Sequence, residues 1–276
     1  RALEGWLHAM IDPAQHGLKP EQMLALDRWA VDRALQLQGE IRELYDQYLF
    51  HQIYQRLHLF CSEDLGAFYL DIIKDRQYTT PVDSVARRSC QTALWHIAEA
   101  LVRWMAPMLS FTADEIWQHL PGERDESVFL EEWYTGLFPL EDDADRQFWA
   151  WVQTLKQGVN KAIEEARNQK VVKANLSAEA TLYVNDDWRA ELDKLGEELR
   201  FVTITSDARL VPLAEAPADE PERADGLKVA IAASEHTKCA RCWHHRPDVG
   251  ANSEHPELCG RCVTNVTGAG EERRYV

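Results

Sequence analysis

Two pairs of cysteines constrain the folding of this chain more than any other feature. They are Cys239-Ala-Arg-Cys242 and Cys259-Gly-Arg-Cys262, separated by 16 residues. Zinc takes four ligands in a tetrahedron at about 2.3 Å from each sulfur, and one C-x-x-C turn places two thiolates on the same side of a tight knuckle. Two knuckles fill the shell and leave no position for water, so the spacing predicts one structural Zn²⁺ ion rather than a catalytic metal.

Other cysteine chemistries fit this spacing less well. A redox dithiol normally uses a single C-x-x-C pair, and iron is the less common metal in such a site. The two remaining cysteines, Cys61 and Cys90, lie in register with apolar residues at helical spacing. We expect both to be buried apolar side chains without a chemical role, and the cysteine usage as a whole to indicate a reducing cytoplasm rather than a secreted disulfide protein.

The first half of the chain carries long stripes of apolar residues at helical spacing. They cover residues 21–49, 53–72 and 84–108, and a further long helix is expected over residues 143–169. Asp83 or Ser84 is the expected N-cap of the third stripe, and Pro107 should end or kink it. Thr112-Ala-Asp-Glu115 reads as a capping box that opens a short helix. Helices of this length joined by short turns predict an antiparallel bundle.

Shorter segments follow the last long helix. Residues 180–184, 201–205 and 209–213 read as strands, with a helix over residues 187–199. Residues 214–226 carry two prolines and five acidic residues and are expected to form a solvated linker. Residues 227–231 alternate as a strand that leads into the cysteine pairs.

These patterns predict a mainly α protein, in which a helical bundle is followed by a small α/β module and a four-cysteine zinc domain. The expected parts are a connector (1–20), the helical domain (21–140), a long helix with an α/β junction module (141–213), the acidic linker (214–226) and the zinc-binding domain (227–276). Because the chain opens at Arg1 without Met or a signal peptide, we expect a piece of a longer protein.

The net charge of −16 argues against a protein that coats nucleic acid through bulk electrostatics, and we expect no DNA partner. The charge is uneven, however. Five basic and two acidic residues lie between Lys156 and Lys173. This leaves room for a selective RNA contact. We expect no membrane partner, since no run approaches the about 18 to 20 apolar residues that span a bilayer.

Six stretches of the chain resemble one known family. They are Leu26-Asp-Arg-Trp-Ala-Val-Asp-Arg33, Phe68-Tyr-Leu-Asp-Ile-Ile-Lys-Asp-Arg-Gln-Tyr78, Ser84-Val-Ala-Arg-Arg-Ser-Cys-Gln-Thr-Ala-Leu94, Ala100-Leu-Val-Arg-Trp-Met-Ala-Pro-Met-Leu-Ser-Phe-Thr-Ala-Asp-Glu-Ile-Trp117, Lys238-Cys-Ala-Arg-Cys-Trp-His244 and Leu258-Cys-Gly-Arg-Cys-Val263. The sequence is similar to bacterial isoleucyl-tRNA synthetases, which are class I aminoacyl-tRNA synthetases. The resemblance covers the whole chain and implies the family's helical anticodon-binding domain and zinc-binding C-terminus.

The family activates isoleucine with ATP, transfers it to tRNA and hydrolyses mischarged valine in an editing domain. Its catalytic signatures, of the H-x-G-H and K-M-S-K-S types, do not occur in this sequence. The resemblance therefore implies that ATP is used by a catalytic domain outside this chain, and that this piece alone has no catalytic residues and no aminoacylation or editing activity. Its implied role is to grip the anticodon stem-loop of tRNA(Ile), as a cytoplasmic monomer.

Proteins that read unpaired RNA bases stack them on aromatic or Arg planes and anchor phosphates with Lys and Arg. The resemblance places the zinc domain beside the anticodon, where Arg241 and Trp243 flank Cys242. Trp243 either stacks on a base or forms a small core beneath the knuckle, with Arg241 only balancing the thiolate charge. Further candidates are Lys74, Arg76, Arg87 and Arg88 for the anticodon stem, and Lys156, Lys161, Arg167, Lys170 and Lys173 for the RNA backbone.

A protein of another class remains an alternative. A helical scaffold whose zinc domain binds protein partners predicts an exposed apolar patch on the helical domain and no affinity for tRNA. A stand-alone metalloenzyme would need an open metal position, which ligation by four cysteines denies.

Overall fold

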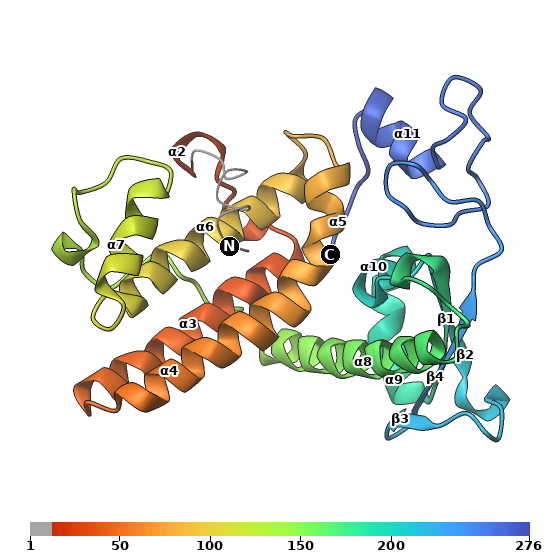
Figure 1. The fold of residues 1–276 in the computed structure, drawn as a ribbon, viewed down its shortest axis with the longest axis horizontal. Coiled ribbons are helices and arrows are strands. Elements are labelled where there is room, and N and C mark those ends of the chain that lie inside the picture. Colours follow the sequence, from red (N-terminus) through yellow and green to blue (C-terminus); the bar gives the residue numbers. More distant parts are fainter. Residues whose placement is uncertain (1–12) are drawn as a thin grey trace. The chain divides into compact units, whose positions relative to one another are not determined.

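The computed structural model describes residues 13–276, which its contacts divide into two compact units (Figure 1). The first unit holds the described residues up to Ile73 together with Val82–Asp142, and the second holds Lys74–Pro81 and Asp143–Val276. Most of the expected connector, residues 1–12, lies outside the described residues. Its remainder holds the short helix α2 (Pro13–His16) and ends at the first residue of η1 (Pro20–Gln22).

The first unit is helical, as expected. Its elements are α3 (Ala25–Asp46), α4 (Phe50–Leu59), η2 (Phe60–Leu70), α6 (Val85–Met105), α7 (Ser110–His119) and η3 (Val128–Leu130), and α5 (Asp71–Thr79) begins in it. The predicted cap of α6 is confirmed, because the Ser84 hydroxyl accepts a hydrogen bond from the Arg87 amide at 3.3 Å. The capping box at Thr112 is wrong, since α7 begins two residues earlier.

A π-helical stretch changes the expected face of the second long helix. Its turns are wider than those of an α-helix, so a residue spacing of four no longer returns to the same side. Phe60 and Leu65 are buried, whereas Cys61 between them is exposed. The prediction that Cys61 is buried is therefore wrong, and the prediction for Cys90 on α6 is confirmed.

The second unit combines a long helix with a four-stranded sheet. It holds α8 (Asp143–Asn168), η4 (Asn175–Ser177), β1 (Ala178–Val184), α9 (Asp186–Leu192), η5 (Asp193–Glu198), α10 (Leu199–Thr203), β2 (Asp207–Pro212), η6 (Leu213–Glu215), β3 (Glu222–Ala224), β4 (Leu227–Ala233) and α11 (Gly260–Thr267). The strand order is β2-β1-β4-β3, with β1 parallel to β2 and the other pairs antiparallel. Alternate residues of β1 are buried, and α8 packs against β4 (Figure 1).

One predicted strand, residues 201–205, is wrong. Leu199–Thr203 form helix α10, and the chain then turns at Ile204, whose φ is 55°. Phe201 and Val202 are both buried although they are adjacent, which a half-buried strand would not allow. Tertiary packing has overridden the β-branched composition of the segment.

The acidic linker is also a wrong prediction. Within residues 214–226, β3 pairs with β4, and the Arg223 guanidinium binds both carboxylate oxygens of Glu165 on α8 at 2.9 and 2.7 Å. Strand β4 lies between β1 and β3 in the sheet. It therefore belongs to the α/β module and not to the zinc domain, which was expected to begin at residue 227.

Among the helices of the described part, none is long and apolar enough to cross a membrane.

Candidate metal centre and nucleic-acid interface

The four cysteines of the two C-x-x-C pairs converge in the second unit. All four are buried, and their sulfur atoms lie within 4.8 Å of one another. The sulfurs of Cys242 and Cys259 are 3.7 Å apart. A tetrahedron with zinc–sulfur bonds of about 2.3 Å has edges of about 3.8 Å, so the cluster fits one structural Zn²⁺ ion.

Local hydrogen bonds shape each knuckle. In the first, the Trp243 amide donates to the Cys239 carbonyl at 3.0 Å, and the Cys239 amide donates to the His244 carbonyl at 2.9 Å. In the second, Cys259 lies directly before the start of α11, and its amide points at the Cys239 sulfur at 3.4 Å. A backbone N–H directed at a sulfur stabilises the thiolate that a metal requires.

Hydrogen bonds among the sulfur atoms shift the pKa values of three of the four cysteines. Contacts with the Cys259 and Cys262 sulfurs, aided by Arg261, lower the pKa of Cys242. The contact with Cys242 raises the pKa of Cys259 to about 11 and also raises the pKa of Cys262. Hydrogen bonds from the Cys259 and Cys262 thiols thus stabilise the Cys242 thiolate, and the same bonds keep those two thiols protonated. A divalent cation would replace these protons and let all four sulfurs ionise.

Of the four histidines near the clustered cysteines, His244 alone is buried. His236, His245 and His255 are at least partly exposed. The Nδ1 of His244 lies 3.2 Å from the Arg200 guanidinium, and burial lowers the pKa of His244 to about 4. Nothing in the sequence indicated that His244 is buried.

The first knuckle presents Trp243 to solvent. Its side chain is 60 % exposed, and the Lys238 ammonium lies 5.3 Å from the centre of its ring. The backbone at Trp243 has φ 66°, a left-handed conformation. The alternative in which Trp243 forms a core beneath the knuckle is therefore wrong.

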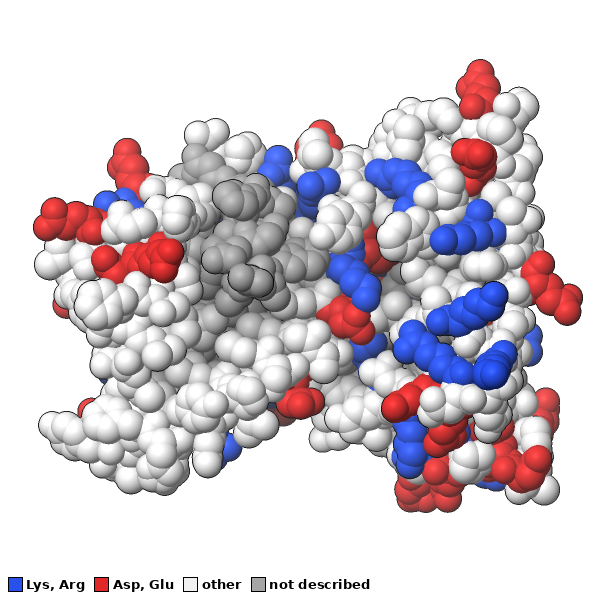
Figure 2. All heavy atoms as spheres, in the orientation of Figure 1, with Lys and Arg blue, Asp and Glu red and all other residues white. Residues whose placement is uncertain are grey.

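Trp243 lines a cavity of about 580 Å³ with four cationic residues. These are Lys74, Arg167, Lys173 and Lys238, and His245 also contributes. They come from α5, the end of α8, the loop after it and the first knuckle. Figure 2 shows Lys and Arg side chains gathered on one face of the second unit, with acidic side chains near β3. We call this cavity the Trp243 pocket.

The structure brings together only some of the predicted RNA contacts. Lys74, Arg167, Lys173 and Trp243 share the pocket. Lys161 and Lys170 are exposed but do not line it, and Arg87 and Arg88 are half-buried on α6 of the first unit. Arg76 and Lys156 are 1 and 2 % exposed, so the predicted contact of Arg76 with the anticodon stem and that of Lys156 with the RNA backbone are wrong. A buried side chain offers no charge to an RNA backbone.

Arg241 has a different partner from the predicted one. Its guanidinium donates a hydrogen bond to the carbonyl of Thr79 at the end of α5. It is thus engaged with the protein rather than free beside Trp243. Lys238 and His245 take its place in the pocket, and sequence reasoning missed both. Lys238 and His245 pair as an isolated β-bridge that closes the first knuckle. Their positions on either side of the first C-x-x-C pair are the feature of the sequence that could have identified them.

Comparison with known proteins agrees with this geometry. The family model of the anticodon-binding domain of tRNA ligase matches residues 27–182, more than half of the chain. The model of a zinc finger found in FPG and IleRS matches residues 238–265, which include all four clustered cysteines.

Several bacterial proteins are similar to this chain over nearly its whole length. The chain is 68 % identical to an isoleucine–tRNA ligase of Alcanivorax borkumensis over 267 residues, 59 % identical to one of Alkalilimnicola ehrlichii over 271 residues, and 60 % identical to one of Pseudomonas putida over 267 residues. Each match covers 96 % of this chain but only 28 or 29 % of the relative. The helical unit, the cysteine cluster and the family model agree, and the chain belongs to the family of anticodon-binding domains of tRNA ligases.

Proposed function

We propose that this chain is the tRNA-gripping part of an isoleucine–tRNA ligase and that it binds the anticodon stem-loop of tRNA(Ile). The observation that carries the proposal is the Trp243 pocket, in which an exposed aromatic ring lies among four cationic side chains. The chain spans about 28 % of the length of the relatives that it matches, so ATP-dependent aminoacylation belongs to other parts of the protein. The protein is expected to work as a cytoplasmic monomer.

The pocket suits an unpaired nucleotide. A base stacks on the indole of Trp243, and its phosphates lie near Lys74, Arg167, Lys173 and Lys238. Because the knuckle is held by metal ligation and backbone hydrogen bonds, the ring is oriented before RNA arrives, which lowers the entropy cost of binding. The net charge of −16 weakens non-specific RNA binding elsewhere on the chain.

The scaffold alternative is not favoured. Large apolar side chains are exposed on the helical unit, such as Phe111 and Tyr48. The family model that covers this unit is nevertheless that of a tRNA ligase.

Binding of a synthetic anticodon stem-loop tests the proposal. Replacing Trp243 by Ala removes the stacking surface but no metal ligand. We expect affinity for the tRNA(Ile) hairpin to fall about 5- to 150-fold, the effect of losing about 1 to 3 kcal/mol of stacking. Fluorescence anisotropy measures the affinity, and metal analysis of the same preparation should find one zinc per chain. Phe111→Ala, which removes an exposed aromatic ring from the first unit, is the matched control.

Two further variants separate stacking from charge. Lys173→Ala removes a phosphate contact in the pocket, so it should weaken cognate and non-cognate hairpins equally and make the salt dependence shallower. Lys170 lies outside the pocket, so Lys170→Ala should reduce the hairpin affinity less than Lys173→Ala does. Unchanged hairpin affinity in a zinc-loaded Trp243→Ala protein would remove Trp243 from the RNA site.

A further inference from the structure

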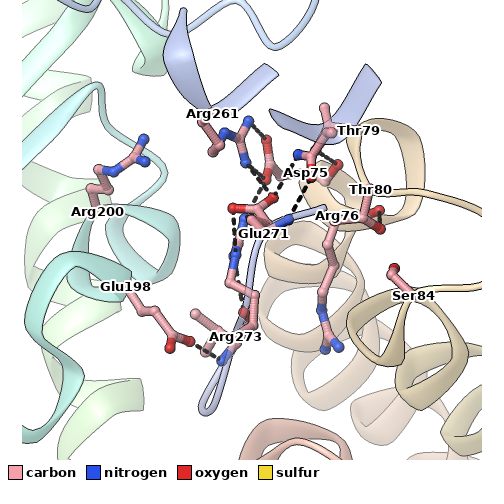
Figure 3. Close-up of polar contacts among 12 residues, drawn as sticks. Asp75, Arg76, Thr79, Thr80, Ser84, Glu198, Arg200, Arg261, Glu271 and Arg273 are labelled. Carbon is pink, nitrogen blue, oxygen red and sulfur yellow. Dashed lines mark hydrogen bonds and ion pairs between the residues drawn. The ribbon is translucent and has the colours of Figure 1, made fainter. Parts of the chain in front are cut away.

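A carboxylate on α5 joins the helix to the second knuckle. Both oxygens of Asp75 accept hydrogen bonds from the Arg261 guanidinium, at 2.6 and 2.9 Å, and Arg273 adds a third at 3.0 Å (Figure 3). Arg261 lies between the metal-cluster residues Cys259 and Cys262 in the sequence. A two-point pairing of this kind fixes the orientation of the knuckle as well as its distance.

A second carboxylate completes the cluster. Glu271 accepts from Arg261 at 3.2 Å and from the Nε of Arg273 at 3.0 Å, so two carboxylates face two guanidiniums (Figure 3). The Arg273 side chain is only 2 % exposed, and that of Asp75 is 17 % exposed. Burial opposes ionisation of Asp75, but Arg261 and Arg273 hold the pKa of Asp75 well below its ordinary value. The pairing is therefore ionic, and removing one member leaves a buried charge without its partner.

The same helix end also holds the first knuckle. The Thr79 carbonyl accepts from Arg241, and the Nε2 of His244 lies 3.7 Å from Asp75. Residues of α5 thus touch both knuckles. The zinc cluster joins the knuckles to each other, but it makes no link to α5, so these polar contacts supply that link.

The chain's last residues are anchored to the α/β module. The Glu198 carboxylate accepts hydrogen bonds from three successive amides, those of Arg274, Tyr275 and Val276, at 2.9, 2.9 and 2.8 Å. Arg273, next to them, lies over the ring of Phe201 at 3.5 Å. Figure 3 shows this tail between α10 and the end of α5, with Arg273 turned toward Asp75. The tail therefore connects the α/β module to the same carboxylate.

We propose that Asp75 is a positioning residue that sets the geometry of the Trp243 pocket. Lys74, its neighbour in the sequence, lines that pocket together with Trp243, yet the two residues belong to segments far apart in the chain. Asp75 fixes the knuckles against the segment that carries Lys74. It thereby keeps the Trp243 ring and the Lys74 ammonium in the lining of the same cavity. The proposal rests on the RNA-binding function proposed above.

The test replaces Asp75 by Asn, which keeps the shape of the side chain and removes its charge. We expect hairpin affinity to fall about 10-fold while one zinc per chain is retained. The Co²⁺-substituted protein should keep the absorption spectrum of a tetrahedral thiolate site. Asp83→Asn, which removes an exposed carboxylate from the next turn, is the matched control. Asp75→Glu, which keeps the charge, should recover part of the affinity.

A double variant separates positioning from general destabilisation. If Asp75 acts through the pocket, Asp75→Asn should weaken binding much less in a Trp243→Ala background than in the wild type. Equal fold-losses in both backgrounds would overturn the proposal. If Asp75→Asn loses zinc, Arg273→Gln carries the same test, because Arg273 lies outside both knuckles.

A reporter that needs no RNA distinguishes this proposal from the function on which it rests. In protein labelled with 5-fluorotryptophan, Trp243→Phe identifies the ¹⁹F resonance of Trp243. Asp75→Asn should shift or broaden that resonance, and Asp83→Asn should leave it in place. A moved resonance in a chain that binds no hairpin would support the positioning role and reject the RNA-binding function. An unmoved resonance with full hairpin affinity would reject the positioning role.

Discussion

His96 shows how burial sets the charge of a single side chain in the helical unit. Its Nδ1 lies 2.7 Å from the hydroxyl of Tyr134. Burial lowers the pKa of His96 to about 4, because an imidazolium ion loses its hydration there. Burial, together with the negative charge of Glu99, raises the pKa of Tyr134. Both partners are therefore neutral at pH 7.

This shift predicts a loss of stability in acid. The folded pKa of His96 lies below its ordinary value of 6.5, so the unfolded chain takes up a proton first as the pH falls. The helical unit should lose about 2 kcal/mol between pH 7 and pH 5 through this residue. Hydrogen exchange of amides in α3 and α6 measures the loss. His96→Gln should flatten this part of the pH dependence, and an identical slope in the variant would contradict the assignment.

At the scale of elements, the turn into β4 is locked to the start of α9. Gly226 has φ 75°, and its carbonyl accepts a hydrogen bond from the Asn185 amide at 3.1 Å. The Asn185 side chain caps α9 by accepting from the Trp188 amide at 3.0 Å. A Cβ on Gly226 would lie 2.1 Å from Nδ2 in the side chain of Asn185. The turn therefore needs glycine both for its backbone and for the space it leaves.

Gly226→Ala should destabilise the second unit by about 2 kcal/mol. About half of this comes from the left-handed backbone and about half from displacement of the cap. Gly39→Ala is the control, because a Cβ at this position in α3 meets no atom within 4 Å. That change should leave the stability unchanged or raise it by up to about 1 kcal/mol. Urea denaturation measures both variants, and equal midpoints for Gly226→Ala and the wild type would refute the argument.

At the scale of the molecule, the metal-bearing segment is tied to the sheet rather than hung from a linker. The His245 amide donates to the Ser206 hydroxyl at 2.6 Å, and the Arg246 guanidinium donates to the Ser206 carbonyl at 3.0 Å. Ser206 lies directly before β2. The Ser234 amide, just after β4, donates to the Ser177 carbonyl at 2.9 Å. The cysteine cluster is thus part of the second unit's fold.

Removal of zinc should therefore loosen the sheet as well as the knuckles. On addition of a chelator we expect faster hydrogen exchange in β1 and β2 and in the knuckles, because metal binding contributes to the folding free energy of this unit. Amides of α3 and α6, which lie in the other unit, should keep their protection. Exchange that rises only after residue 233 would show that the segment folds independently of the sheet, and uniform loss in both units would show that they unfold together.

Local patterns in the sequence determined the long helices and the four-cysteine cluster. Apolar residues at helical spacing predicted α3, α6 and α8 because the helix repeats every few residues, whatever it packs against. The C-x-x-C pairs predicted their cluster because each knuckle is a short-range turn. Ser84 predicted the start of α6 for the same reason.

Only the tertiary structure decided which distant surfaces meet. The pairing of Asp75 with Arg261 joins residues 186 apart in the chain, and a single acidic residue between Lys74 and Arg76 gives little sign of it. Residues 201–205 have the composition of a strand, but the edge strand beside β1 is β2, and the earlier segment folds as α10. Strand pairing and buried ion pairs depend on contacts between remote segments. The free energies of these contacts cannot be inferred from the local periodicity of the sequence.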